Sequence, residues 1–207
     1  MSFHDILADV GRYYSDKVRT FGPTARGADW NSPESQELRF EQLLKVCDVS
    51  RPFSINDYGC GYGALAEYMT RKGCTFRYCG FDISADMLSK AMELQRGRSQ
   101  CTFVHEDSGL AAMDYTVASG IFNVRLGIGD SEWQDYVTHA LERLSELSEK
   151  GFAFNMLTKY SDPERMRPDL YYADPCRVFD QCKTRFSKQV ALLHDYGLYE
   201  FTVIVRK

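Results

Sequence analysis

The sequence has no uninterrupted apolar run of the roughly eighteen residues that a membrane-spanning helix needs. Its N-terminal segment, MSFHDILADVGRYYSDK, carries too many charges for a secretory signal. Internal repeats and low-complexity tracts are also absent. These absences argue against membrane, secreted and repeat proteins, and we expect a cytoplasmic location.

Cysteine pairs with metal-binding spacing are missing as well. The chain has seven cysteines, and none of them forms a CxxC pair. An odd number without that spacing fits neither a disulfide framework nor a zinc site. We interpret the cysteines as reduced thiols in a reducing compartment.

The sequence also lacks an excess of positive charge. Its formal net charge is −4 at pH 7, and its basic clusters, TRKGC and LQRGRSQ, are short. Such a chain has no general attraction for nucleic-acid phosphates or for an anionic membrane. We therefore expect neither as a partner, and the sequence gives no indication of oligomeric state.

Enough apolar material is present for an ordinary core. The 207 residues are 44% hydrophobic, which suits one domain that needs no disulfide or structural metal. Residues 3–21 place apolar side chains at helical spacing, and Gly22 and Pro23 then break the pattern. Ser32, followed by Pro33 and an acidic residue, predicts the start of a second helix that runs to about Val46.

From Phe53 onward, short apolar runs alternate with amphipathic stretches, which is typical of strand–helix units around a parallel sheet. Strands are predicted near Ser54–Tyr58, Arg77–Phe81, Thr102–His105, Tyr115–Ser119 and Gly151–Leu157. Helices are predicted near Ala64–Lys72, Ser84–Gln95, Glu132–Glu149 and Pro175–Arg185.

The C-terminal segment, KQVALLHDYGLYEFTVIVRK, has a different pattern. It contains two extended runs joined only by HDYGL, which is too short for the crossover between parallel neighbours. The last strand should therefore run antiparallel. The predicted fold is a doubly wound α/β sheet of seven strands, mostly parallel, with an antiparallel C-terminal strand and helices on both faces.

A glycine-rich turn follows the first predicted strand, in the segment INDYGCGYGALAEYM. Gly59, Gly61 and Gly63 would let backbone N–H groups approach a ligand closely. The spacing from Gly59 to Ala64 also satisfies the dinucleotide fingerprint GxGxxG/A. However, Asp57 beside the turn would repel a pyrophosphate, whereas it could accept the ammonium group of a cationic ligand such as S-adenosylmethionine.

DYGCGYG, Asp57 to Gly63, resembles the first motif of class I S-adenosylmethionine-dependent methyltransferases, an acidic residue followed by three alternate glycines. In order along the chain, YCGFDIS, FVHEDSG and YTVASGIFN resemble that family's next strand ends. The antiparallel tail resembles its seventh strand. The resemblance covers roughly residues 53–207. It implies a single methyltransferase domain, with residues 1–50 as a helical cap and 51–207 as a Rossmann-like cofactor-binding core.

The resemblance also implies roles for individual residues. Asp82 would hold the ribose hydroxyls of S-adenosylmethionine, although capping the helix that begins after Ser84 is an alternative role. Glu106 or Asp107, with Asp107 favoured, would meet the adenine amino group. The predicted cofactor contacts are Asp57, Gly59, Cys60, Gly61, Gly63, Asp82, Ile83, Met87, Glu106, Asp107, Ser108, Ser119, Gly120 and Ile121, with Tyr14 and Trp30 covering the cofactor or the acceptor.

The methyl acceptor is harder to infer, because methyl transfer needs a general base only when the acceptor must lose a proton. The segment after the fourth predicted strand lacks the Asp of the family's metal-dependent catechol-type enzymes and the Asn/Asp-Pro-Pro-aromatic motif. We therefore expect no catalytic metal and a small-molecule acceptor. Its methylated atom would be a hydroxyl oxygen of a sugar or other metabolite, or else the nitrogen of a small amine.

Residues outside the common core are the candidates for acceptor contacts. The predicted substrate-binding residues are Asn123, Arg125, Tyr160, Tyr171 and Arg167, and the candidate catalytic residues are His194 and Tyr172. Lys159, Arg165 and Arg167 could hold an anionic group.

Two rival functions remain open from the sequence. A nicotinamide-dependent oxidoreductase is disfavoured by Asp57, by the antiparallel tail and by a chain too short for a separate substrate domain. A non-catalytic domain that binds S-adenosylmethionine remains possible, because cofactor motifs can outlast the chemistry.

Overall fold

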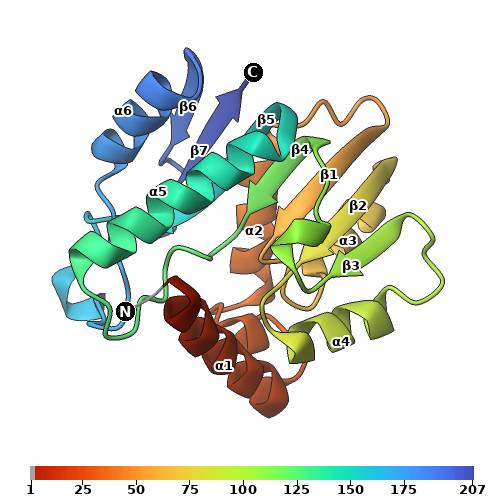
Figure 1. The fold of residues 1–207 in the computed structure, drawn as a ribbon, viewed down its shortest axis with the longest axis horizontal. Coiled ribbons are helices and arrows are strands. Elements are labelled where there is room, and N and C mark those ends of the chain that lie inside the picture. Colours follow the sequence, from red (N-terminus) through yellow and green to blue (C-terminus); the bar gives the residue numbers. More distant parts are fainter. Residues whose placement is uncertain (1–2) are drawn as a thin grey trace.

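The computed structural model describes residues 3–207, with side chains from residue 6 onward (Figure 1). A seven-stranded sheet in the order β3-β2-β1-β4-β5-β7-β6 forms the centre of the molecule. Within it, β7 runs antiparallel to both of its neighbours, and the other pairings are parallel. The predicted fold class is confirmed. The strands are β1 (Phe53–Tyr58), β2 (Phe76–Phe81), β3 (Cys101–Val104), β4 (Met113–Ala118), β5 (Ser148–Leu157), β6 (Gln189–Leu193) and β7 (Glu200–Arg206).

The helices agree with the sequence pattern in order and type. They are α1 (Phe3–Phe21), α2 (Pro33–Leu44), α3 (Ala64–Arg71), α4 (Ala85–Leu94), α5 (Asp130–Glu146) and α6 (Pro175–Arg185), with short 3₁₀ turns at Arg26–Ala28, Asp107–Gly109 and Pro163–Arg165. The predicted start of α2 is confirmed, because the Ser32 hydroxyl accepts from the Ser35 N–H, while Ser35 Oγ accepts from the Ser32 N–H. None of the described helices is long and apolar enough to cross a membrane.

The predicted end of α5 at Glu149 is wrong. The helix ends at Glu146, and β5 begins only two residues later at Ser148. The Leu147 carbonyl accepts hydrogen bonds from the Met113 N–H and the Thr116 hydroxyl of β4, so the sheet captures the chain at this point. Polar residues that looked like a last helical turn therefore begin the strand.

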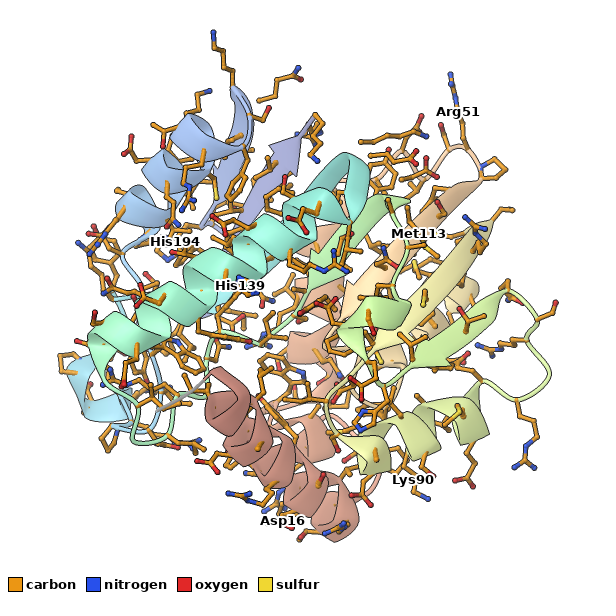
Figure 2. The ribbon with its side chains drawn as sticks, viewed as in Figure 1. Asp16, Arg51, Lys90, Met113, His139 and His194 are labelled. Atoms are coloured by element: carbon orange, nitrogen blue, oxygen red, sulfur yellow. The ribbon has the colours of Figure 1, made fainter. Side chains whose placement is uncertain are left out.

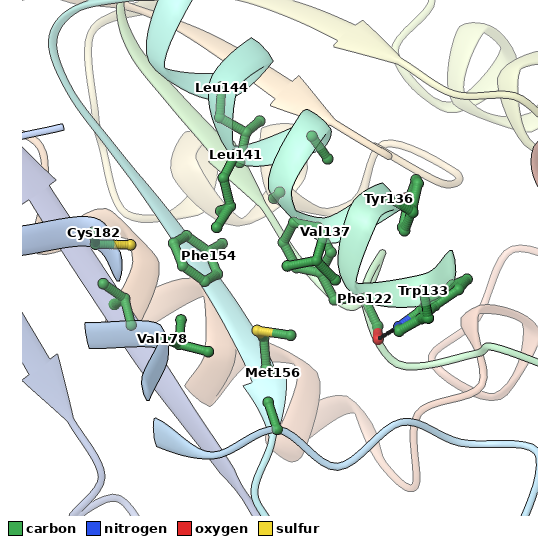
Figure 3. Packing of buried hydrophobic residues seen from close by; sticks show 14 of the residues in the cluster. Phe122, Trp133, Tyr136, Val137, Leu141, Leu144, Phe154, Met156, Val178 and Cys182 are labelled. Carbon is green, nitrogen blue, oxygen red and sulfur yellow. Dashed lines mark hydrogen bonds between the residues drawn. The ribbon is translucent and has the colours of Figure 1, made fainter. Parts of the chain in front are cut away.

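Helices cover both faces of the sheet. The side chains of β5 alternate between the two hydrophobic clusters on these faces. Side chains alternate across a strand, so Phe152, Phe154 and Met156 point into the cluster that α5 and α6 complete. Ala153 points to the opposite cluster with α2 and α3. Figure 3 shows the first cluster, where the Trp133 indole N–H also donates to the Phe122 carbonyl at 3.1 Å.

The two N-terminal helices take different places. Helix α2 packs on the face of the sheet against β4, β5 and β7. Helix α1 lies beside α4, where the hydroxyls of Ser15 and Ser84 are 2.8 Å apart and Arg19 pairs with Asp86 (Figure 1). Helix α2 is thus part of the layered core, whereas α1 is not in contact with the sheet to the same extent, and the division into a cap of residues 1–50 and a core stays a prediction.

A buried ion pair joins α2 to the start of β7. Arg39 donates from Nε and Nη2 to the two oxygens of Glu200, at 2.8 and 2.7 Å. Both side chains are buried. The paired geometry offsets the desolvation of the two charges only while both partners are present.

We predict that Glu200→Ala lowers the free energy of unfolding by about 3–5 kcal/mol, because it leaves the Arg39 charge buried without a partner. Glu37→Ala is the matched control, because Glu37 pairs with Arg71 at 2.7 Å on the surface, and it should cost about 1 kcal/mol or less. Urea unfolding followed by circular dichroism measures both. Equal losses in the two variants would contradict this assignment.

Candidate functional site

The glycine-rich turn lies at the carboxyl end of β1 and leads into α3. Gly59, Gly61 and Gly63 all have positive φ angles, of 84°, 54° and 78°, which favour glycine. The N–H groups of Gly59 and Cys60 both donate to the Phe81 carbonyl at 2.8 Å, which ties the turn to the end of β2. A Cβ on Gly59 would collide with the Ile121 side chain. The turn after β4 thus approaches the bare backbone closely.

A cavity opens over this turn, at the edge where parallel-sheet proteins bind ligands. It encloses about 900 Å³, including the part open to solvent. Helix α1, the loop after it, the glycine-rich turn, the end of β2 and the turn after β4 form its walls. We call it the first cavity. It is lined by Leu7, Val10, Tyr14, Ala28, Trp30, Gln36, Phe40, Asp57, Tyr58, Gly59, Cys60, Gly61, Tyr62, Ala64, Phe81, Asp82, Ile83, Met87, Ser119, Gly120, Ile121 and Tyr136.

Asp57 and Asp82 are the charged residues among the described lining of this cavity, which includes no lysine, arginine or histidine. Asp57 is 3% exposed and accepts one hydrogen bond, from the Tyr78 hydroxyl at 2.7 Å. Desolvation by burial raises the pKa of Asp57 to about 7. Burial also raises the pKa of Asp82 to about 6, although its oxygens accept from the Gly61 and Ser84 N–H groups at 2.8 Å. An acidic cavity of this kind suits a cationic ligand and disfavours a pyrophosphate.

The structure brings most of the predicted cofactor residues to the first cavity. Gly63 instead supports the turn from behind, where a Cβ would press on Ala91 and Phe103. Those that line it are Tyr14, Trp30, Asp57, Gly59, Cys60, Gly61, Asp82, Ile83, Met87, Ser119, Gly120 and Ile121.

Glu106, Asp107 and Ser108, which we expected near the adenine group, are not among the residues that line this cavity. Asp107 begins a 3₁₀ turn and accepts from Arg143 Nε of α5, at 3.0 and 3.1 Å to its two oxygens. This ion pair draws the turn toward α5. The sequence could not show it, because Arg143 is remote along the chain.

Sequence reasoning missed a residue that supports the cavity from within the sheet. Asn155 of β5 is fully buried, and its Oδ1 accepts from the Gly120 N–H at 2.8 Å. Its Nδ2 donates to Ser119 Oγ at 3.2 Å. One signal was available, since Asn155 is a polar residue within the apolar run GFAFNML.

A second cavity adjoins the first and shares Tyr14, Ala28 and Trp30 with it. It is more polar and encloses about 1,190 Å³, including its open part. The segment after β5 and the hairpin between β6 and β7 contribute to its walls. Its remaining lining residues are Asp29, Asn31, Arg39, Asn123, Val124, Leu157, Ser161, Arg165, Arg167, Leu170, Tyr172, Gly197, Leu198, Tyr199 and Glu200.

Trp30 forms the wall between the two cavities. A Cβ on Gly120 would lie 2.5 Å from the Trp30 ring, so the turn after β4 packs directly against the indole. On another side, the Arg39 guanidinium lies 4.0 Å from the centre of the ring. Because Glu200 fixes Arg39, the buried ion pair also positions this wall.

The predicted acceptor residues divide between the second cavity and other places. Asn123, Arg167 and Tyr172 line it, whereas Arg125 pairs with Asp130 and Tyr171 packs beside Trp133. No histidine is among the described residues that line either cavity.

His194 and Tyr160 lie together, and neither is among the residues that line the two cavities. Their rings are 6.0 Å apart, and the His194 ring is also 6.0 Å from that of Phe201. Figure 2 shows His194 on the side of α6, away from α4. It follows β6, at the edge of the sheet. His194 therefore has no part in the proposal below.

Parts of this sequence are similar to proteins of known description. A family model described as a methyltransferase domain matches residues 55–150. A Mycobacterium tuberculosis protein named "Putative methyltransferase Rv1506c" is 51% identical over 164 residues, which span 79% of this chain and 99% of that protein. The chain belongs to the class I S-adenosylmethionine-dependent methyltransferases.

Solved structures show the same fold in this methyltransferase family and beyond it. One is the 1,6-didemethyltoxoflavin-N1-methyltransferase of Burkholderia thailandensis, solved with 1,6-didemethyltoxoflavin and S-adenosylhomocysteine. It has a TM-score of 0.68 and 16% identity, covering 100% of this chain and 91% of that one. The [4+2]-cyclase SpnF has a TM-score of 0.62 and 14% identity, covering 89% and 73%. At these identities the likeness shows the fold alone.

We predict that Asp82→Ala weakens S-adenosylmethionine binding by about tenfold or more, because a buried charged hydrogen-bonding group is lost. Asp107→Ala is the matched control at the next strand end, and its affinity should stay within about twofold of wild type because Arg143 holds Asp107 outside the cavity. Isothermal titration calorimetry measures both. An equal loss in Asp107→Ala would contradict the placement of Asp107.

We also predict that S-adenosylmethionine binds more tightly as the pH rises from 5.5 to about 8. In the free protein, Asp57 and Asp82 hold protons up to about pH 7 and about pH 6, respectively. A cationic ligand favours the carboxylates, so binding releases protons and strengthens as pH rises until both groups are ionised. Calorimetry across this range measures the slope, and Asp57→Asn should remove most of it above pH 6. Affinity that is flat or falls with rising pH would contradict the proposed contacts.

Proposed function

We propose that this methyltransferase binds S-adenosylmethionine in the first cavity and methylates a small organic molecule in the second. The observation that carries the proposal is the junction of the two cavities at Tyr14, Ala28 and Trp30. One side of the junction carries buried carboxylates without a lining cation, and the other side is open and polar. A cationic methyl donor and a polar acceptor could meet there.

The residues of the first cavity fit the cofactor. Asp57 has one oxygen occupied by Tyr78, and no other described group hydrogen-bonds to it, so the carboxylate can accept the ammonium group of the amino-acid end. Asp82 can accept the ribose hydroxyls through its remaining lone pairs, while Gly61 and Ser84 hold its orientation. S-adenosylmethionine supplies the methyl group as an electrophile on a positive sulfur.

The chain's contribution to the reaction is orientation and exclusion of water. S-adenosylmethionine would give its methyl carbon to the acceptor atom, with the electron pair of the S–CH₃ bond returning to sulfur, and would leave as S-adenosylhomocysteine. Tyr14 and Trp30, which border both cavities, would keep the two reactants in line and shield the sulfonium.

The residues around the junction indicate which kind of acceptor atom is methylated. Burial raises the pKa of Tyr14 far above its usual range, so its hydroxyl stays protonated and does not serve as a general base. Asp29 accepts from the Tyr13 hydroxyl and the Lys17 ammonium, both at 2.6 Å, so its carboxylate is already engaged by these two groups. A hydroxyl oxygen, the first expectation from the sequence, would need a base, so an acceptor atom that is already unprotonated is favoured.

The cytoplasmic location expected from the sequence stays a prediction.

Binding and product release test this function. Calorimetry should show that S-adenosylmethionine and S-adenosylhomocysteine bind, whereas NAD does not bind because the acidic cavity repels its pyrophosphate. A screen of small acids, amines and hydroxylated compounds should then yield S-adenosylhomocysteine. NAD binding without S-adenosylmethionine binding would overturn the proposal. Binding without methyl transfer to any compound of the screen would favour the non-catalytic alternative.

A further inference from the structure

Asn123 presents unpaired donors to the second cavity. Its side chain is 5% exposed, and its Oδ1 accepts from the Leu157 N–H at 3.1 Å. Because a backbone N–H can only donate, this contact fixes the orientation of the amide and leaves Nδ2 with both of its N–H groups. No hydrogen bond from Nδ2 is present within residues 3–207. Nδ2 is not among the buried side-chain atoms that lack a partner, so it is open to the cavity, and a ligand there can accept from it.

Two further donors line the same cavity. The Tyr172 hydroxyl accepts from the Arg167 N–H at 3.0 Å, so its own proton remains available for another acceptor. The Arg165 guanidinium lies 3.9 Å from Asp162, beyond hydrogen-bond distance, and makes no hydrogen bond within the described chain. It is mostly exposed, at the mouth of the cavity.

The carboxylates of this cavity are already satisfied. Asp29 accepts from Tyr13 and Lys17, and Glu200 accepts twice from Arg39. The walls therefore offer a ligand donors from Asn123 and Tyr172 and a cation from Arg165. Asp162, 3.9 Å from Arg165, does not line the cavity and accepts from the Tyr199 hydroxyl. Such a surface suits a negatively charged oxygen group and disfavours an ammonium group.

We propose that the methyl acceptor is a small organic oxyanion, whose carboxylate or phosphate group binds Asn123, Tyr172 and Arg165. This inference rests on the proposed function, because it assigns the substrate class of the same enzyme. Arg167 contributes less, because Asp169 already holds its guanidinium. A cationic amine is excluded as the acceptor on this account.

Calorimetry on the protein saturated with S-adenosylhomocysteine tests the inference without knowledge of the natural acceptor. The probes are succinate, inorganic phosphate and the neutral analogue succinamide. We expect at least one anion to bind about tenfold more tightly than succinamide, because charged hydrogen bonds replace neutral ones. Tighter binding of succinate would indicate a carboxylate acceptor, and tighter binding of phosphate would indicate a phosphate ester.

Variants test whether the anion binds at the proposed residues. Arg165→Gln should weaken anion binding by about tenfold, and Tyr172→Phe by a smaller factor. Lys90→Gln removes the same charge from a lysine of α4 that pairs with Glu93 and does not line the cavity, so anion affinity should stay within about twofold of wild type. Succinamide binding as tightly as both anions, or unchanged anion affinity in Arg165→Gln, would overturn the inference.

The outcomes separate the two proposals. Failure of S-adenosylhomocysteine to bind in the loading step would count against the proposed function. Tight binding of S-adenosylhomocysteine without anion selectivity would overturn only the oxyanion inference. Methyl transfer to neutral or amine acceptors, with none to their acidic counterparts, would also overturn only the oxyanion inference.

Discussion

The burial of Asp57 and Asp82 at adjacent strand ends is the constraint on which the rest of the site depends. Both carboxylates line a cavity whose described walls hold no cation, and desolvation raises the pKa of each. A buried acid of this kind costs stability when it ionises, unless a positive ligand compensates. This loss of stability falls at the carboxyl edge of the sheet, where parallel-sheet proteins bind ligands. An acidic cavity at that edge favours a cationic ligand over a phosphate-bearing one.

Core residues of the sheet and of α2 also fix the wall between the first and the second cavity. Helix α2 and strand β7 pack together in the core, and their ion pair, Arg39 with Glu200, fixes the Trp30 ring between the cavities. Gly120 allows the turn after β4 to approach the same ring, and Asn155 holds the turn in place. The boundary between the two cavities is thus built from residues held by the core.

Local sequence patterns predicted the features that depend on neighbouring residues. The glycine-rich turn, the Ser32 cap and the antiparallel tail each follow from a short stretch of chain. Features that depend on distant partners were not predictable. Asp107 matched a motif, but its ion pair with Arg143 of α5 could not be read from that motif. His194 ends a strand at the expected edge, but only the strand order shows that β6 lies far from the first cavity.

A crystal structure of the protein with S-adenosylhomocysteine would test the central claim most directly. The account predicts that the ligand's amino group lies within hydrogen-bond distance of Asp57 and its ribose hydroxyls within that distance of Asp82. Its sulfur should face the junction at Tyr14 and Trp30. A ligand bound outside the first cavity, or one whose ribose lies away from Asp82, would contradict the account.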